Sequence, residues 1–331
     1  MNNKLFFENV YICDSSATVG KKESEGPLGN RFDSYEMDEY FGCENFEEAE
    51  SEMVRQNLNL LLGKANLSFN DIDLLTGGDL INQCTATSFA ITDTKIPFLG
   101  LYGACSTIIE GLICASTFVN CGYASNAICF ASSHFCASER QYRFPLEYGS
   151  TRTPTSQNTV TGTGAFLLSN QKTKIKIKSA TIGRIIDKGV TDANNMGAAM
   201  ACAAVDTIER FFSDGSNKPE DFDIITTGDL GIEGHSIARE MLLLDNMDLG
   251  KRFTDCGMII YEKETQDTHA GGSGCGCIAS VLAGHFMKLI NERQIRNILA
   301  IGTGALLNPN SVFQKRSIPA VAHAVHISLE D

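Results

Sequence analysis

The chain has 331 residues, of which 43% are hydrophobic, and a formal net charge of −13 at pH 7. This length and apolar content predict a folded protein of two domains or two similar halves, and they exclude a largely disordered chain. The negative charge argues against non-specific nucleic-acid binding and against docking on anionic lipid by charge alone.

Neither a membrane span nor a signal peptide is expected. Apolar runs stay below the roughly 18 residues that a transmembrane helix needs, and the first residues, MNNKLFFE, soon become acidic. Most of the twelve cysteines lie in apolar runs without the paired spacing of a zinc site. We therefore expect a reducing, cytoplasmic compartment, no structural disulfides and no protein-bound metal.

The first half is predicted to alternate buried strands with helices. A helix is expected over residues 46–63, with Gly63 as its C-cap. Strands are expected over residues 9–19, 71–80, 96–101 and 126–132. Between the last two strands, apolar and small residues occupy nearly every position up to residue 123, which predicts a helix buried on all sides.

The second half repeats the first in the same order. Residues 221–230 match residues 71–80 at six of ten positions. The other paired segments are residues 16–21 with 179–184, 103–106 with 272–275, and the strand 126–132 with 297–302, which follows a predicted helix over 278–292. Two such halves back to back predict a layered α-β-α-β-α body with two buried helices between two sheets.

The segment GACST at residues 103–107 opens the first buried helix. It places Cys105 at a helix N-terminus, where the macrodipole favours thiolate over thiol, and Ser106 and Thr107 where they can cap backbone N–H groups. Such a turn can hold a nucleophile or an anion. The alternative is that Cys105 is an inert small hydrophobe, as most buried cysteines are.

The GACST turn and the repeated halves resemble the thiolase and β-ketoacyl synthase superfamily. More specifically, the chain resembles the stage V sporulation protein AD family along nearly its whole length. The motifs that carry this resemblance are residues 79–83, 96–99, 102–107, 131–134, 138–143, 147–149, 159–162, 271–275 and 303–307. The resemblance implies a thiolase-like fold with an N-terminal half at residues 1–170 and a C-terminal half at 171–331.

The resemblance also implies a role in endospore formation. Members of the family bind dipicolinate (pyridine-2,6-dicarboxylate), alone or as its calcium chelate, and assist its uptake into the developing spore with membrane proteins of the same operon. By the same resemblance we expect a homodimer, located in the cytoplasm or peripherally on the spore inner membrane. No cofactor is expected, and calcium enters only as part of the chelate.

Enzymes of the superfamily pair the cysteine with His/His or His/Asn, which deprotonate the substrate and hold the thioester oxygen. Here an aspartate, Asp229, stands where the first histidine is expected, and His235 is a weak substitute six residues later. His269 is interpreted as a polar residue beside a turn. His285 is expected on a packed or exposed helix face, and His323 and His326 on the polar face of a strand.

A dicarboxylate site needs cationic hydrogen-bond donors, a helix N-terminus that favours anions and a narrow cleft for a flat ring. We expect Cys105 to form its floor and a polar wall to come from His134, Glu139, Arg140 and Arg143. Each wall residue can instead belong to a surface ion-pair cluster. The polar loop over residues 192–196 is a further candidate for the mouth of the site.

Two other functions remain open at this point. The chain can be an acyltransferase or condensing enzyme that acts on an acyl thioester through Cys105. It can also be a scaffold with a vestigial pocket that assembles membrane partners.

Overall fold

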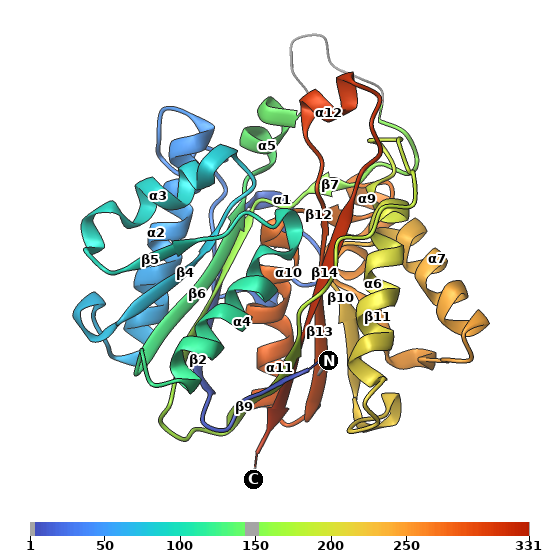
Figure 1. Cartoon of the computed structure of the whole chain (residues 1–331). Coiled ribbons are helices and arrows are strands. Elements are labelled where there is room, and N and C mark those ends of the chain that lie inside the picture. Colours follow the sequence, from blue (N-terminus) through green and yellow to red (C-terminus); the bar gives the residue numbers. More distant parts are fainter. Residues whose placement is uncertain (1–3, 143–151, 331) are drawn as a thin grey trace.

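Two sets of five strands form the body of the molecule (Figure 1). The computed structural model describes residues 4–142 and 152–330. The first set contains β2 (Tyr11–Val19), β4 (Leu74–Gly78), β5 (Phe98–Gly100), β6 (Asn126–Ser133) and β8 (Gly162–Ser169). The second contains β9 (Ile175–Thr181), β10 (Ile224–Thr227), β11 (Phe253–Asp255), β13 (Asn297–Ala305) and β14 (Ala320–Leu329).

The two sets have the same topology. The full order is β11-β10-β13-β14-β9-β2-β8-β6-β4-β5, so within each half the strands pair as first, fifth, fourth, second and third along the chain. In both halves the fifth strand is antiparallel to its neighbours, and the next two pairings are parallel. The repeats found in the sequence therefore correspond to equivalent strands. The expected division after residue 170 falls between β8 and β9.

Two separate sheets were expected, but the sheets of the two halves are joined at one place. β2 and β9 pair over two positions, Tyr11 with Lys176 and Ile12 with Ile175, so the sheets share one seam. Beyond this seam α4 (Thr107–Asn120) and α10 (Cys275–Ser280) lie between the two sheets (Figure 1). The outer faces carry α2 (Phe46–Ala65) and α3 (Thr85–Ile91) on one side, and α6 (Met196–Phe212) and α7 (Gly231–Leu244) on the other. This arrangement confirms the predicted thiolase-like α-β-α-β-α fold.

Shorter elements complete the described chain. They are β1 (Leu5–Phe6), β3 (Ser34–Tyr35), β7 (Asn158–Thr159), β12 (Gly272–Ser273), α1 (Lys21–Ser24), α5 (Phe135–Tyr142), α8 (Cys256–Ile259), α9 (Lys263–Gln266) and α12 (Pro309–Phe313). None of the helices described here combines the length and apolarity that crossing a bilayer requires.

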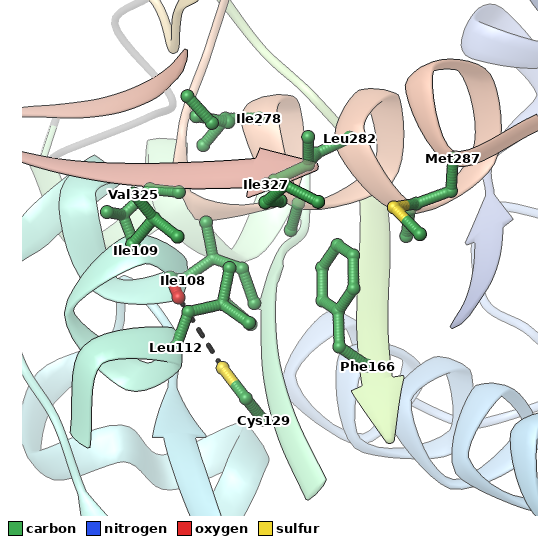
Figure 2. Close-up of a cluster of buried hydrophobic side chains, with 14 of the residues drawn as sticks. Ile108, Ile109, Leu112, Cys129, Phe166, Ile278, Leu282, Met287, Val325 and Ile327 are labelled. Atoms are coloured by element: carbon green, nitrogen blue, oxygen red, sulfur yellow. Dashed lines mark hydrogen bonds between the residues drawn. The ribbon is translucent and has the colours of Figure 1, made fainter. Parts of the chain in front are cut away.

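The central layer is held by apolar contacts between the halves. Ile108 and Leu112 of α4 belong to one buried cluster with Leu282 from the second central helix and Ile327 of β14 (Figure 2). All four side chains are fully excluded from solvent. Burial of this layer fixes where both central helices begin, and therefore where Cys105 lies.

Two helix boundaries differ from the sequence-based expectation. α2 continues through Gly63 and ends at Asn66, whose φ of 53° is the left-handed conformation that asparagine tolerates. The helix predicted over 278–292 already begins at Cys275 and contains a π-helical segment, Val281–Phe286, before α11 (Met287–Asn291).

Glycine allows the second central helix to touch the first sheet. A Cβ on Gly164 of β8 would lie 2.0 Å from the carbonyl oxygen of Ala279 in α10. A Cβ on Gly276 would lie 2.2 Å from the carbonyl oxygen of Gly162. Glycine at these two positions therefore permits a close backbone approach that any side chain would block.

We predict that Gly164→Ala lowers the free energy of unfolding by at least about 2 kcal/mol, because the backbone of α10 must shift to admit the methyl group. Gly63→Ala in α2 is the matched control. Nothing lies within 4 Å of its added Cβ, so it should stabilise by about 0.5–1 kcal/mol. Urea unfolding of both variants checks this, and equal stability of the two would contradict the packing described.

Candidate ligand site

A tight turn presents Cys105 at the start of the first central helix. Ala104 has a φ of 52°, and a single 3₁₀ turn, Ala104–Ser106, leads into α4. Ser106 Oγ donates to the carbonyl of Gly103 at 2.7 Å, and Thr107 Oγ1 donates to that of Ala104 at 2.7 Å. The two hydroxyls therefore brace the turn, where helix capping was expected of them.

A buried carboxyl group lies next to the thiol. Asp229 is fully buried and accepts hydrogen bonds from Ser273 Oγ and Thr303 Oγ1, both at 2.7 Å, and from the Gly274 amide at 3.2 Å. Ser273 Oγ also lies 3.8 Å from Cys105 Sγ. The chain thus forms a contiguous group of thiol, hydroxyl and carboxyl, with no imidazole in it.

This environment keeps the thiol protonated. Burial raises the pKa of Cys105 well above its ordinary value, and the charge of Asp229 raises it further. Burial also raises the pKa of Asp229, and its hydrogen bonds to Cys105, Ser273 and Thr303 counteract that rise. The helix dipole was expected to favour thiolate, but desolvation and a neighbouring negative charge outweigh it.

A cavity of about 330 Å³ opens beside Cys105 between the two halves. Its walls come from α5, from the loop before α6, and from β7, β12 and the end of β13. The described residues that line it are Leu80, Ala104, Cys105, Ser138, Glu139, Tyr142, Gln157, Thr159, Ala193, Asn194, Met196, Ser273, Gly274, Ala305 and Leu307. These lining residues include no Lys, Arg or His.

Two polar atoms of this lining are buried without a hydrogen-bond partner, Ser138 Oγ and Gln157 Oε1. Gln157 Nε2 donates to the carbonyls of Asp229 at 2.7 Å and Gly272 at 3.0 Å, which fixes the orientation of the amide. A buried polar group without a partner is costly, so both atoms mark places where a ligand can bind.

The four residues expected to form the polar wall of the site do not lie together. Glu139 lines the cavity together with Cys105. His134 lines a separate hollow, where its Nε2 lies 2.8 Å from the carbonyl oxygen of Glu39. Arg140 points away from the cavity and pairs with Glu47 at 3.4 Å, 46% of its side chain being exposed. Arg143 lies outside the described residues.

All six histidines of the sequence are described, and each contacts groups other than the Cys105 thiol. His235 stacks on Phe253, His269 lies 3.4 Å from Asp267, and His285 packs beside Phe286. His323 and His326 were expected on a polar strand face, but both are buried, where they bind the Gly183 amide and Asn297 Oδ1. In the described part of the chain, no three His, Cys, Asp or Glu residues gather as a metal site.

The sequence reasoning missed Ser138 and Gln157. Gln157 had no local signal, because its role depends on carbonyls of residues 229 and 272, which only the fold brings near. Ser138 directly precedes Glu139, which was a candidate, and its helical position was the available signal. Asn194 belongs to the polar loop that was proposed for the mouth of the site, and it does line the cavity.

Comparison with known proteins identifies relatives of the whole chain. The family model described as Stage V sporulation protein AD (SpoVAD) matches residues 2–328. A curated protein of that name from Bacillus subtilis (strain 168) is 40% identical over 321 residues, which are 97% of this chain and 95% of that protein.

Solved structures show the same fold at low identity. The 3-oxoacyl-(acyl-carrier-protein) synthase III of Aquifex aeolicus VF5 has a TM-score of 0.60 at 14% identity, covering 96% of this chain and 99% of the other. A variant of OleA from Xanthomonas campestris has a TM-score of 0.63 at 13% identity, covering 98% of each chain. At such identities the likeness establishes the fold alone.

We predict that Asp229→Asn increases the rate of iodoacetamide alkylation at Cys105 near pH 8 several-fold, because removing the negative charge lowers the thiol pKa and so enlarges the reactive thiolate fraction. Peptide mass spectrometry reports the rate at this cysteine. Ser273→Ala, which keeps the carboxyl group, should change the rate less. An unchanged rate in a natively folded Asp229→Asn protein would contradict this electrostatic explanation.

Glu23 is buried at the wall of the hollow around His134, and its titration predicts a pH dependence of stability. Burial raises the pKa of this carboxyl to about 7, against about 4.3 in an unfolded chain. The folded state then binds the proton more tightly, so the free energy of unfolding falls as pH rises from about 4.5 to 7, by about 3 kcal/mol.

Denaturant unfolding between pH 4.5 and 8 checks this. Glu23→Gln should lack this decline, so the stability of wild type relative to the variant falls over that interval and levels off above pH 7. The exposed Glu25→Gln should retain it. Parallel pH profiles for wild type and Glu23→Gln would refute the assignment.

Proposed function

The chain belongs to the stage V sporulation protein AD family, and from this membership and the cavity beside Cys105 we propose that it binds dipicolinate as the calcium chelate. In this proposal the protein is a binding protein that assists uptake of the ligand into the developing spore. The observation that carries the choice of ligand form is the buried, partnerless Oε1 of Gln157 in a cavity shared with Glu139.

The charges of the cavity favour the chelate over free dipicolinate. Free dipicolinate is a dianion, and the described lining offers it no cation, while the buried Asp229 carboxyl group lies directly behind Ser273. The calcium chelate is neutral. It therefore avoids the repulsion that the dianion meets.

Dipicolinate is tridentate and leaves part of the calcium coordination sphere open, which oxygen atoms of the cavity can fill. Calcium takes six to eight oxygen ligands, including carboxylates and amide carbonyls. Gln157 Oε1 and the Glu139 carboxylate can fill open positions, while Ser138 Oγ can hydrogen-bond a ligand carboxylate. Tyr142, Met196 and Leu307 provide apolar surface for the flat pyridine ring.

The proposal extends to partners. We expect the protein to act at the spore inner membrane with membrane proteins of the same operon, and to form a homodimer. In support of the homodimer, β5 is an edge strand of the described sheet, and Leu99 on it is 39% exposed. An edge strand can pair with the same strand of a second copy.

An acyltransferase acting through Cys105 is the second candidate. The solved structures of similar fold are, by their names, 3-oxoacyl-(acyl-carrier-protein) synthases and OleA, and Cys105 lies at a helix start beside a cavity. Against it, the nearest ionisable group of the described site is a carboxyl, which accepts protons as a base but repels a developing oxyanion.

Calorimetric titration tests the first proposal. A premixed equimolar solution of calcium and dipicolinate should bind at one site per chain, and dipicolinate alone should bind at least about tenfold more weakly. Glu139→Gln should weaken chelate binding about tenfold through loss of a calcium ligand. Arg140→Gln is the matched control and should leave the affinity unchanged, since Arg140 pairs with Glu47 off the cavity.

Two outcomes would refute this arrangement. One is the absence of heat with either form at millimolar ligand. The other is loss of binding in Arg140→Gln with none in Glu139→Gln, which would favour the arginine wall expected from the sequence.

Mass spectrometry after incubation with acetyl-CoA tests the second candidate. We predict no adduct, because the protonated thiol is a poor nucleophile and no imidazole contacts it. An acetyl group on Cys105 that is absent in Cys105→Ala would establish the enzyme instead.

A further inference from the structure

A second hollow, of about 150 Å³, lies around His134 and shares no lining residue with the Cys105 cavity. It is enclosed by α1, by the start of α5 and by β7. The described residues that line it are Gly20, Lys21, Lys22, Glu23, Glu39, His134, Phe135, Cys136, Asn158 and Thr161. Neither the proposed function nor the resemblance uses this hollow as a separate site.

Two cationic side chains, Lys22 of the lining and Arg152 just outside it, converge on Asn158 Oδ1, a neutral atom of the wall. Lys22 Nζ lies 3.5 Å from Asn158 Oδ1, and Arg152 Nη1 lies 3.3 Å from the same oxygen. Burial lowers the pKa of Lys22, and the charge of Arg152 lowers it further. Two positive charges that share an uncharged acceptor repel each other, and an anion between them would relieve that repulsion.

The nearby carboxyl groups offset this positive charge only in part. Asp267 pairs with Arg152 through Nη2 at 3.0 Å and is 80% exposed. Glu39 lies at the exposed rim. Glu23 accepts hydrogen bonds on one oxygen from Tyr261 and from the Thr161 amide, and burial raises its pKa to about 7. Within the part of the chain described here, Lys22 forms no ion pair.

His134 adds a requirement of its own. The residue is 1% exposed, and its Nε2 lies 2.8 Å from the Glu39 carbonyl, which can only accept a hydrogen bond. Nε2 therefore carries the hydrogen. Nδ1 is buried and has no partner, and because burial lowers the imidazole pKa, the ring is neutral and Nδ1 is a hydrogen-bond acceptor. A ligand that satisfies this atom must bring a proton.

We propose that the hollow is a binding site for a hydrogen phosphate ion. Its unprotonated oxygens accept hydrogen bonds from Lys22 and Arg152, and its P–OH group donates to Nδ1 of His134. A small tetrahedral oxyanion suits the limited volume, and the protonated form combines negative charge with the donor that the imidazole needs. The site shares no lining residue with the cavity beside Cys105.

Titration of the full chain with inorganic phosphate at pH 7 and constant ionic strength tests this. Phosphate should bind at one site per chain and raise the thermal midpoint. Sulfate is the matched probe, because it has the same shape but carries no proton at this pH, and it should bind at least tenfold more weakly.

Variants locate the site. Lys22→Gln and Arg152→Gln, each checked for a native thermal transition, should weaken phosphate binding at least tenfold. Lys188→Gln, which removes the same charge from an exposed position elsewhere, should leave it unchanged. Glu139→Gln should also leave it unchanged, which separates this test from that of the proposed function.

Three results would overturn the proposal. The first is no phosphate binding at millimolar concentration. The second is an equal loss in Lys188→Gln and Lys22→Gln, which would indicate charge screening only. The third is equal affinity for sulfate and phosphate, which would remove His134 Nδ1 as the acceptor of the ligand proton.

Discussion

The burial of the Asp229 carboxyl group against the Cys105 thiol constrains everything that the central cavity can do. Two hydroxyls and a backbone amide hold this carboxyl in place, and no cation among the described residues neutralises it. Burial, together with this negative group, keeps the thiol protonated, and the negative group opposes an oxyanion. The same group favours a ligand that is neutral or presents a positive centre, which is the physical basis for preferring a metal chelate to a free dicarboxylate.

The duplicated fold places this carboxyl next to the thiol. The turn before α4 comes from the first half, and the turn before α10 comes from the second. They touch where Cys275 Sγ donates to the Ala104 carbonyl at 2.9 Å. Both central helices begin at the same end of the layer (Figure 1). The two turns and the end of β13 therefore line one cavity. The site is thus a property of the contact between halves rather than of either half.

Much of the fold was predictable from the sequence, but less of the site. The strands, the buried helix after Cys105 and the order of the repeats followed from apolar patterning and from near-identical segments such as residues 71–80 and 221–230. Glu139 was recognised because it lies in the motif at residues 138–143, and Asp229 because it stands where a histidine is expected. The direction in which a side chain of α5 points was not predictable, and it separates Glu139, which lines the cavity, from Arg140, which pairs with Glu47 outside it. Gln157 depends on two carbonyls far along the chain, so no local pattern could reveal it.

The most direct test of the account is an anomalous-scattering map of crystals grown with calcium dipicolinate. The account predicts a calcium peak in the cavity beside Cys105, at about 2.3–2.6 Å from Gln157 Oε1 or from a Glu139 carboxylate oxygen. Continuous density on Cys105 Sγ from a covalent adduct, or ligand density confined to the hollow around His134, would contradict it.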